Sequence, residues 1–317
     1  MNPSYKTGYK APFLFKNAHI QTIIPSVFRK PFPPFYVRER INTVDNDFID
    51  LDWSVIKAKK LAIISHGLEG NSTRAYVTGM VNALNKNDWD ALALNFRGCS
   101  GEPNKLLQSY HSGFTDDLAL TIKHAKEKQR YDEIALVGFS IGGNITLVYL
   151  GRDKVDPIVK KASVISVPCD LKGSSECLAK PVNIIYMKRF LRMFHEKIKA
   201  KMAFMPDKIN DNDYKEIKNF KQFDDRYTAP IHGFKNALDY WGKCNSLQFI
   251  KNIEIPTLII NAKNDPFLSD SCYPIKESDN NKNIALEMPE SGGHVGFIAF
   301  NNEKIYWSEK RTLDFFS

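Results

Sequence analysis

Ser140 lies in a glycine-rich pentapeptide that is typical of a catalytic nucleophile. The pentapeptide GFSIG (138–142) follows the apolar run 134–137 and precedes residues with helical spacing. A strand, a tight turn and a helix in this order form a nucleophile elbow, in which a strained turn holds the serine hydroxyl clear of the sheet edge. The alternative is an ordinary glycine-rich turn between a strand and a helix. We interpret Ser140 as a candidate nucleophile.

A serine nucleophile requires a histidine base, because the neutral hydroxyl is a poor nucleophile. His294 follows the apolar run 283–289 in a glycine-rich loop, which is where this base is expected. The other histidines after Ser140 are His195, in a lysine-rich helical segment, and His232, in an insertion. We therefore predict that His294 is the base, against the alternative of a structural loop histidine.

A carboxylate must fix the tautomer of that histidine. Asp265 follows the apolar run 256–262 and is the preferred candidate, although Asn-Asp-Pro is also a common composition for a solvated turn. Asp170, after the run 162–168, is the main rival, because the acid can be presented from that strand end instead. Asp270 lies too far past its strand to compete well.

Two backbone N–H groups are needed to stabilise the oxyanion that develops on the substrate. Ile141 follows the nucleophile and supplies one of them. The loop after the run 61–67, with the sequence HGLEG, supplies the other, and Leu68 is the candidate. His66 could be read as a second base, but a structural hydrogen-bonding role is favoured.

Composition and the lack of other motifs narrow the function. No dinucleotide, Walker or paired-histidine motif is present, so we predict no cofactor and no metal. The net charge of +8 is not accompanied by a nucleic-acid recognition module, so nucleic acid is not an expected partner. No signal peptide or membrane span is evident, and we expect a cytoplasmic protein with reduced thiols. The cysteines are scattered and odd in number: Cys99, Cys169, Cys177, Cys244 and Cys272.

Apolar strands alternate with amphipathic helices, which predicts an α/β fold with a mostly parallel sheet covered on both faces. The hydrolase core is expected over 1–170 and 251–317, beginning with an irregular, proline-broken arm (1–34) that packs on the body. Residues 35–57 indicate an antiparallel hairpin. Residues 171–250 interrupt the alternation and are expected to form a helical cap insertion.

One helix of this insertion, within 180–204, combines an apolar stripe with many basic residues. Packing of the stripe on the body is the favoured reading, and peripheral contact with an anionic membrane is the alternative. The stripe comprises Met187, Phe190, Leu191, Phe194, Ile198 and Met202. The basic residues around it are Lys188, Arg189, Arg192, Lys197, Lys199 and Lys201.

Stretches in the same order over nearly the whole chain resemble the YheT-like family of α/β-hydrolases, also called the AB hydrolase 4 family. They include NAHIQTIIPSVFR (17–29), SHGLEGNS (65–72), NFRGCSGEPN (95–104), YHSGFTDDL (110–118), GFSIGGNITLVYLG (138–151), NAKNDPF (261–267) and GGHVGFI (292–298). The resemblance implies an α/β-hydrolase fold and carboxylic ester hydrolysis. It carries the catalytic roles onto Ser140, Asp265 and His294.

The resemblance also marks Arg97, His111 and Asp117 without giving them chemistry. Arg97 is expected in a structural ion pair, with pocket shaping as the alternative, and His111 could line the site or anchor its loop. The predicted function is therefore a serine esterase acting on a small-molecule or lipid ester. An acyltransferase with the same residues and a non-catalytic binding module are the alternatives. The sequence does not indicate the oligomeric state.

Overall fold

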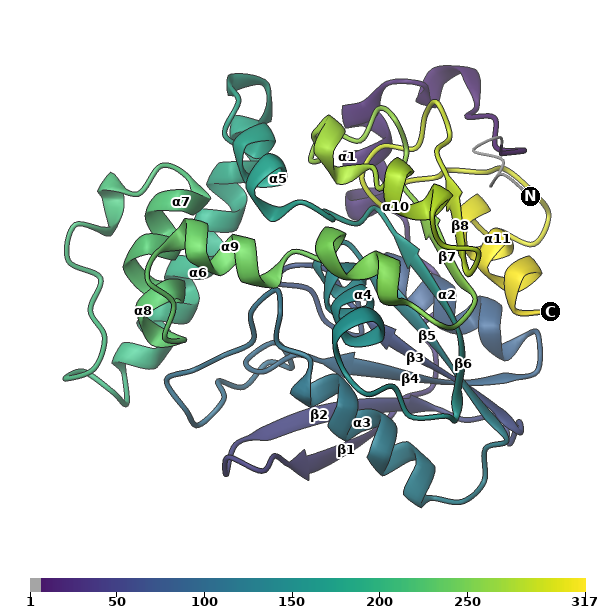
Figure 1. The fold of residues 1–317 in the computed structure, drawn as a ribbon, viewed down its shortest axis with the longest axis horizontal. Coiled ribbons are helices and arrows are strands. Elements are labelled where there is room, and N and C mark those ends of the chain that lie inside the picture. The colour runs from purple at the N-terminus through teal and green to yellow at the C-terminus, as the bar shows by residue number, and fades with distance from the viewer. Residues whose placement is uncertain (1–6) are drawn as a thin grey trace.

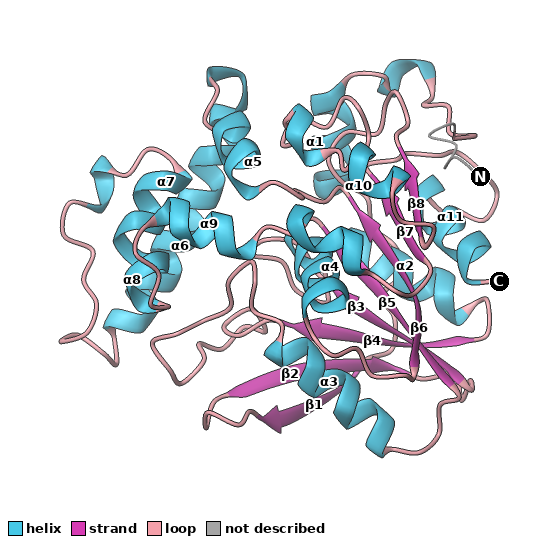
Figure 2. Ribbon diagram, in the orientation of Figure 1, coloured by secondary structure: helices cyan, strands magenta, loops and turns pink. Residues whose placement is uncertain are grey.

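The computed structural model describes residues 7–317, which fold around an eight-stranded sheet (Figures 1 and 2). The strand order is β1-β2-β4-β3-β5-β6-β7-β8. The strands are β1 Val37–Asn42, β2 Phe48–Ser54, β3 Lys60–Ser65, β4 Trp89–Asn95, β5 Glu133–Phe139, β6 Val159–Ile165, β7 Thr257–Ile260 and β8 Ile284–Glu287.

The sheet is parallel from β4 to β8, and its antiparallel part is the hairpin of β1 and β2 together with the β2–β4 pairing. The predicted α/β class and the predicted hairpin are confirmed. Because parallel strands end at the same edge, the loops after β3, β5, β7 and β8 are brought to one side of the sheet. The candidate nucleophile, base, preferred acid and oxyanion donors follow these four strands.

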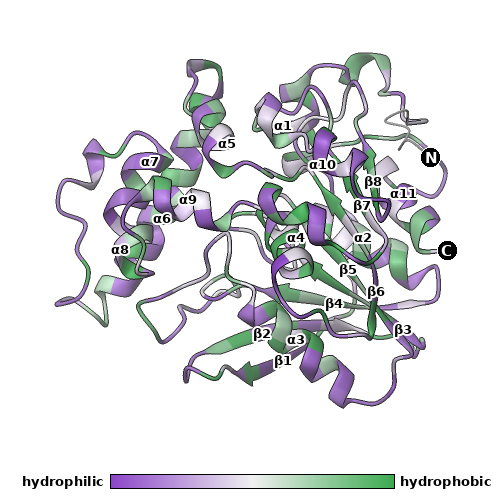
Figure 3. Ribbon diagram, in the orientation of Figure 1, coloured by the Kyte–Doolittle hydropathy of each residue, from purple (hydrophilic) through white to green (hydrophobic). Residues whose placement is uncertain are grey.

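Neighbouring residues of a strand point to opposite faces of the sheet. In the central strands both sets are apolar, so helices cover both faces. Leu136 packs in a core with Ile122 and Ile145, whereas Val137 packs in a second core with Met80 and Phe316. The hydropathy colouring shows the central strands as largely hydrophobic (Figure 3). The helices of this core are α2 Ala75–Asn85, α3 Asp116–Glu127, α4 Ile141–Arg152, α10 Ile275–Asp279 and α11 Trp307–Phe316.

The segment between β6 and β7 forms a group of helices beside the C-terminal edge of the sheet, which we call the helical insertion (Figure 1). It has a hydrophobic core of its own, which also contacts Phe267 of the sheet domain. Its α-helices are α5 Leu171–Leu178, α6 Ile184–Met202, α7 Phe220–Phe223, α8 Ala229–Ile231 and α9 Ala237–Cys244. A π-helical turn, Asp224–Thr228, joins α7 to α8.

Helix α6 buries most of the apolar stripe that the sequence predicts. Two of its basic residues do not follow the prediction of a charged outer face. The Lys201 side chain is buried and donates to the Asn104 carbonyl oxygen over 2.7 Å. Lys197 also turns inward, toward the Glu69 carboxylate. The other four basic residues of α6 are exposed.

The expectation of an irregular N-terminal arm is wrong over Ala18–Phe28, which form helix α1. The Asn17 side chain caps the helix by accepting from the His19 and Ile20 amides. Pro25 lies inside it and costs one helical hydrogen bond, but its burial, together with that of Thr22, offsets the loss by packing. Residues 1–6 of the predicted arm lie outside the described residues.

Candidate functional site

Ser140 occupies a strained turn between β5 and α4. Its φ is +52°, and its N–H donates to the Ile165 carbonyl oxygen over 2.8 Å. Gly142 follows in the first turn of α4, where a Cβ would lie 2.4 Å from the carbonyl oxygens of Ser65 and His66. Only glycine lets α4 approach β3 this closely, so the second glycine of the pentapeptide permits the turn that exposes the serine hydroxyl.

The structure brings Ser140, His294 and Asp265 into one hydrogen-bonded chain. His294 Nε2 lies 2.9 Å from Ser140 Oγ, and His294 Nδ1 lies 2.9 and 3.1 Å from the two Asp265 oxygens. A carboxylate only accepts, so Nδ1 carries the proton and donates to Asp265. Nε2 is then free to accept the proton of the Ser140 hydroxyl. This arrangement can activate a serine oxygen for attack on a carbonyl carbon.

Residues that the sequence analysis did not single out hold the His294 loop in place. Thr22 Oγ of α1 accepts from the His294 amide over 2.9 Å, and the Phe267 ring stacks on the imidazole with centroids 4.1 Å apart. Asn264 Oδ1 accepts from the amides of Gly292 and Gly293. These residues lie in the family-like stretches 17–29 and 261–267, which marked them in the sequence. The stretches alone do not indicate which residues these side chains contact.

The rival candidates have partners other than Ser140. Asp170 caps α5 by accepting from the Lys172 amide. His195 pairs with Asp211, 2.9 Å away, within the helical insertion, and His232 packs against the ring of His111. Asp270 begins a short 3-10 helix. None of these side chains has a hydrogen bond to Ser140 or His294 among those found within residues 7–317.

The two candidate oxyanion donors border the same cavity as Ser140. Leu68 and Ile141 line it together with His294, and its volume is about 90 Å³. Gly67, before Leu68, donates to the Tyr76 hydroxyl over 3.0 Å and accepts from the Gly70 amide over 2.9 Å. These bonds fix the shape of the loop that presents the Leu68 amide.

His66 supports this loop from behind. Its Nδ1 lies 2.7 Å from the Gly67 carbonyl oxygen, and its Nε2 accepts from the Phe96 amide over 3.2 Å. Burial lowers the pKa of His66 to about 3, so the ring stays neutral. His66 does not line any of the three cavities described for this protein, so its contacts are those of a structural residue.

Arg97 and His111 differ in their surroundings. Arg97 makes a two-pronged ion pair with Asp117, with distances of 2.9 and 2.8 Å, and a further one with Asp45 at 2.6 Å. It lines none of these cavities. His111 does line one, next to His232, and burial lowers its pKa to about 3. Arg97 therefore ties loops together, whereas His111 contributes to a cavity wall.

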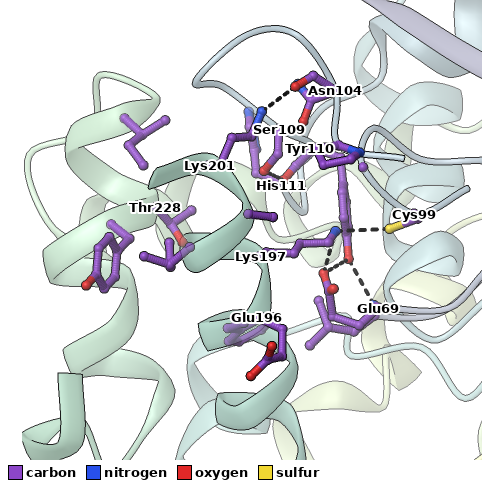
Figure 4. A pocket seen from close by; sticks show the side chains of 18 of the residues that line it. Glu69, Cys99, Asn104, Ser109, Tyr110, His111, Glu196, Lys197, Lys201 and Thr228 are labelled. Carbon is purple, nitrogen blue, oxygen red and sulfur yellow. Dashed lines mark hydrogen bonds and ion pairs between the residues drawn. The ribbon is translucent and has the colours of Figure 1, made fainter. Parts of the chain in front are cut away.

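A larger cavity of about 420 Å³ extends from Leu68 and Ile141 beneath the helical insertion. Apolar atoms form most of its surface, although charged side chains also line it, among them Glu102, Lys201 and Asp224. A group of polar side chains lies at one wall, around Lys197 (Figure 4). The apolar lining includes Leu107, Phe194, Ile198, Ile209, Phe223 and Ile231. A cavity of this character suits an aliphatic chain better than a polar group.

The polar group at this wall links the helical insertion to the Leu68 loop. Lys197 Nζ of α6 lies 2.9 Å from Glu69 Oε1 and 3.1 Å from Cys99 Sγ. The Tyr110 hydroxyl donates to Glu69 Oε1 and accepts from the Glu69 amide (Figure 4). Burial raises the pKa of the Cys99 thiol to about 11, so the counter-ion of Lys197 is Glu69. Glu69 directly follows Leu68, and the pair therefore anchors that amide.

Lys197→Met is expected to lower the free energy of unfolding by about 2 kcal/mol, because it leaves the buried Glu69 carboxylate without its cation. The turnover number should fall as well, because the Leu68 loop loses its anchor. Urea unfolding and ester hydrolysis measure the two effects. Lys199→Met is the matched control, since Lys199 is exposed on the same helix and its ion pair is with exposed Glu196. Equal stabilities for the two variants would contradict this role of Lys197.

Asp224, in the π-helical turn, borders both the 90 Å³ cavity at Ser140 and the 420 Å³ cavity. It accepts from the Thr228 hydroxyl over 2.6 Å and from Trp241 Nε1 over 2.8 Å. Burial outweighs these hydrogen bonds and raises its pKa from 3.8 to about 7. A neutral carboxyl group therefore faces the cavities below neutral pH.

The raised pKa of Asp224 predicts a pH dependence of stability. The folded state binds the Asp224 proton more tightly than the unfolded state does. This difference adds to the free energy of unfolding, fully below about pH 4, and the added stability is lost as pH rises to about 7. We expect the wild type to lose on the order of 2 kcal/mol between pH 5 and 8 relative to Asp224→Asn, which mimics the protonated form. Urea unfolding of both proteins at the two pH values measures the difference. If the free energies of unfolding of the two proteins changed equally with pH, the raised pKa of Asp224 would be contradicted.

The remaining groups with potential for metal or redox chemistry are dispersed. The five cysteines are free and buried. Within residues 7–317, no cluster of three or more histidine, cysteine, aspartate or glutamate side chains has a geometry that could hold a metal ion. In the same part of the chain, no helix has both the length and the apolar composition needed to cross a bilayer.

Comparison with known proteins places these features in a family. Residues 62–299 match the family model described as the alpha/beta hydrolase fold. The chain is 36% identical over 292 residues to "Putative esterase YheT" of Escherichia coli, covering 90% of this chain and 85% of that protein. It is 27% identical over 289 residues to phospholipase ABHD3 of Mus musculus, covering 88% and 70% of the two chains.

A solved structure shows the same fold. The Pyrococcus furiosus esterase Pf2001 superposes with a TM-score of 0.60, covering 89% of this chain and 91% of that chain at 18% sequence identity. At that identity the likeness concerns the fold alone. This structure and the family match confirm the expected fold. The 36% identity to the Escherichia coli relative over 90% of this chain confirms the YheT-like resemblance expected from the sequence.

Proposed function

This chain is a hydrolase of the α/β-hydrolase family, and we propose that it cleaves carboxylic esters with Ser140 as nucleophile, His294 as general base and Asp265 as the orienting carboxylate. The observation that carries the proposal is the position of His294, whose ring lies 2.9 Å from both Ser140 Oγ and an Asp265 oxygen. The names of the relatives, an esterase and a phospholipase, support an ester as the substrate.

In the proposed reaction, Ser140 Oγ attacks the ester carbonyl carbon while His294 Nε2 takes the hydroxyl proton. The N–H groups of Leu68 and Ile141 stabilise the negative charge on the carbonyl oxygen. The bond to the alcohol oxygen then breaks, and His294 gives its proton to the leaving alcohol. Water attacks the acyl-enzyme in the same way, which releases the carboxylic acid and restores Ser140. No step requires a cofactor.

We propose that the acyl chain lies in the cavities between the sheet and the helical insertion, which would act as a cap. The apolar lining favours aliphatic acyl groups over sugars or peptides. Neutral Asp224 is compatible with such a chain below neutral pH. The proposed substrate is therefore a small or lipid-like ester with an aliphatic acyl group.

A fluorophosphonate probe tests the mechanism directly. The probe should form a phosphorus–oxygen bond with Ser140 Oγ and release fluoride, which intact mass spectrometry detects as one adduct. Ser140→Ala should remain unlabelled. An unlabelled wild type would instead indicate a non-catalytic binding module. Product analysis with added alcohols separates the hydrolase from an acyltransferase, which would transfer the acyl group to the alcohol rather than to water.

We also propose peripheral contact with an anionic lipid surface. Val27 and Phe28 of α1 and Ile185 at the start of α6 are exposed apolar side chains, and Val27 and Ile185 line the same cavity. Exposed Lys188 and Arg192 follow Ile185 by about one and two turns of α6. Charge complementarity favours anionic lipids. Sedimentation should recover more protein with phosphatidylglycerol vesicles than with phosphatidylcholine vesicles, and Phe28→Glu/Ile185→Glu should abolish the difference. Equal recovery with both vesicles would reject this contact.

We also propose a cytoplasmic location, which can be measured together with the oligomeric state. Cell fractionation tests the first, with cytoplasmic recovery as the predicted result. Sedimentation velocity determines the second.

A further inference from the structure

A further cavity of about 350 Å³ reaches Ser140 and His294, and its lining shares only Leu68 and Gly70 with that of the 420 Å³ cavity. Helix α1, the start of α2, helix α6 and the His294 loop form its walls. Its apolar lining includes Ile23, Val27 and Ile185, which are exposed to solvent. The cavity is therefore an open groove that leads from the protein surface to the serine hydroxyl.

The groove carries positive charge without matching negative charge. Arg29, Arg74 and Arg189 line it, and its lining includes no aspartate or glutamate. Arg29 is neutralised by Glu309, at 2.6 and 2.8 Å. Arg74 donates to the Glu69 carbonyl oxygen over 2.9 Å. Two guanidinium groups therefore remain that no carboxylate neutralises within the described residues.

Arg189 is the more available of the two. It has no hydrogen bond or ion pair to another side chain within residues 7–317. Desolvation by the groove wall, together with the charges of Arg74 and Arg192, lowers its pKa from the usual value although the side chain is exposed. Bringing cations together in this way costs free energy that a bound anion would recover, since an arginine fork matches a phosphate or carboxylate in geometry.

The position of the groove relative to His294 indicates which half of the ester enters it. Leu68 lines the groove and both cavities beneath the helical insertion, so it does not distinguish them. His294 lines the groove and the 90 Å³ cavity but not the 420 Å³ cavity. Val295 lines only the groove, whereas Ile141 lines only the two cavities beneath the insertion. The leaving oxygen must receive its proton from His294 Nε2, so the alcohol half extends on the His294 side. The acyl half then points toward the helical insertion.

We propose that Arg189 and Arg74 bind an anionic group, a phosphate or a carboxylate, on the alcohol half of the ester substrate. This inference rests on the proposed ester hydrolysis at Ser140. It adds a substrate class, namely an aliphatic acyl ester whose alcohol carries an anion. The apolar groove wall contacts the part of the alcohol between the ester oxygen and that anion.

Two esters that differ only in the anion test the proposal: monooctanoylglycerol and its phosphate monoester. We expect the wild type to have the higher kcat/KM for the phosphate monoester. Arg189→Gln should lower the ratio of the two kcat/KM values about tenfold, as expected for one charge-assisted hydrogen bond, and Arg189→Lys should restore part of it. Lys199→Gln is the matched control, because Lys199 is an exposed cation of the same helix that does not line the groove.

The outcomes separate this inference from the proposed function. A ratio that is unchanged in Arg189→Gln, or that falls equally in Lys199→Gln, overturns the anion subsite and leaves ester hydrolysis intact. A wild type that prefers the neutral ester overturns it as well. Ser140→Ala that still cleaves both esters refutes the proposed function itself. Salt should reduce the ratio in the wild type and have little effect in Arg189→Gln, since the preference is electrostatic.

Discussion

Ser140→Ala is expected to lower kcat for ester hydrolysis by about 10⁵-fold while leaving the fold intact. The change removes only the Oγ atom, whose hydrogen bond is to His294 Nε2. The backbone of the elbow is held by other contacts, including the bond from the Ser140 amide to the Ile165 carbonyl oxygen. Alanine fits the same turn, because the Cβ is already present.

Initial rates with a short p-nitrophenyl ester measure this effect. Thermal unfolding followed by circular dichroism is the control, and the midpoint should lie close to that of the wild type. Full activity in Ser140→Ala would show that another group attacks the ester. The residual rate in the variant reports the contribution of the remaining site, including the N–H groups of Leu68 and Ile141.

Asp265→Asn is expected to lower kcat by roughly 10³- to 10⁴-fold. The variant places an amide where the carboxylate accepts from His294 Nδ1. An amide group that donates toward Nδ1 stabilises the tautomer that carries its proton on Nε2. That nitrogen then cannot accept the proton of the Ser140 hydroxyl. The loss therefore arises from the wrong tautomer, with little change in geometry.

Asp170→Asn is the matched control, since Asp170 is the alternative acid at the neighbouring strand end. Its side chain accepts from the Lys172 amide at the start of α5, and asparagine caps a helix about as well as aspartate. We expect kcat and stability close to those of the wild type. A large loss of kcat in Asp170→Asn with a small loss in Asp265→Asn would reverse the assignment of the acid.

Much of the fold follows from local patterns. The apolar runs form the strands of the sheet, and the run at 134–137 followed by GFSIG forms the strand, turn and helix that the pattern predicts. A strand pattern and a glycine-rich turn can be recognised from neighbouring residues alone, so both features are local. The class of the fold and the place of Ser140 were therefore predictable.

The arm and the helix α6 were predicted less well. Helix α1 forms despite Pro25, because packing of Thr22 and Pro25 offsets the missing hydrogen bond. Lys197 turns inward because Glu69, far away in the sequence, offers a buried counter-charge. Local propensity favours neither result, since both depend on partners that the fold brings together.

The sequence by itself determined the strand order along the chain, the elbow around Ser140, and the short list of histidines and carboxylates that could serve it. Only the tertiary structure decided that Asp265, rather than Asp170, contacts His294, and that Arg189 faces a groove without a counter-ion. The reason is physical: residue types and spacing define what each segment can form. Distances between segments depend on how the strands and helices pack.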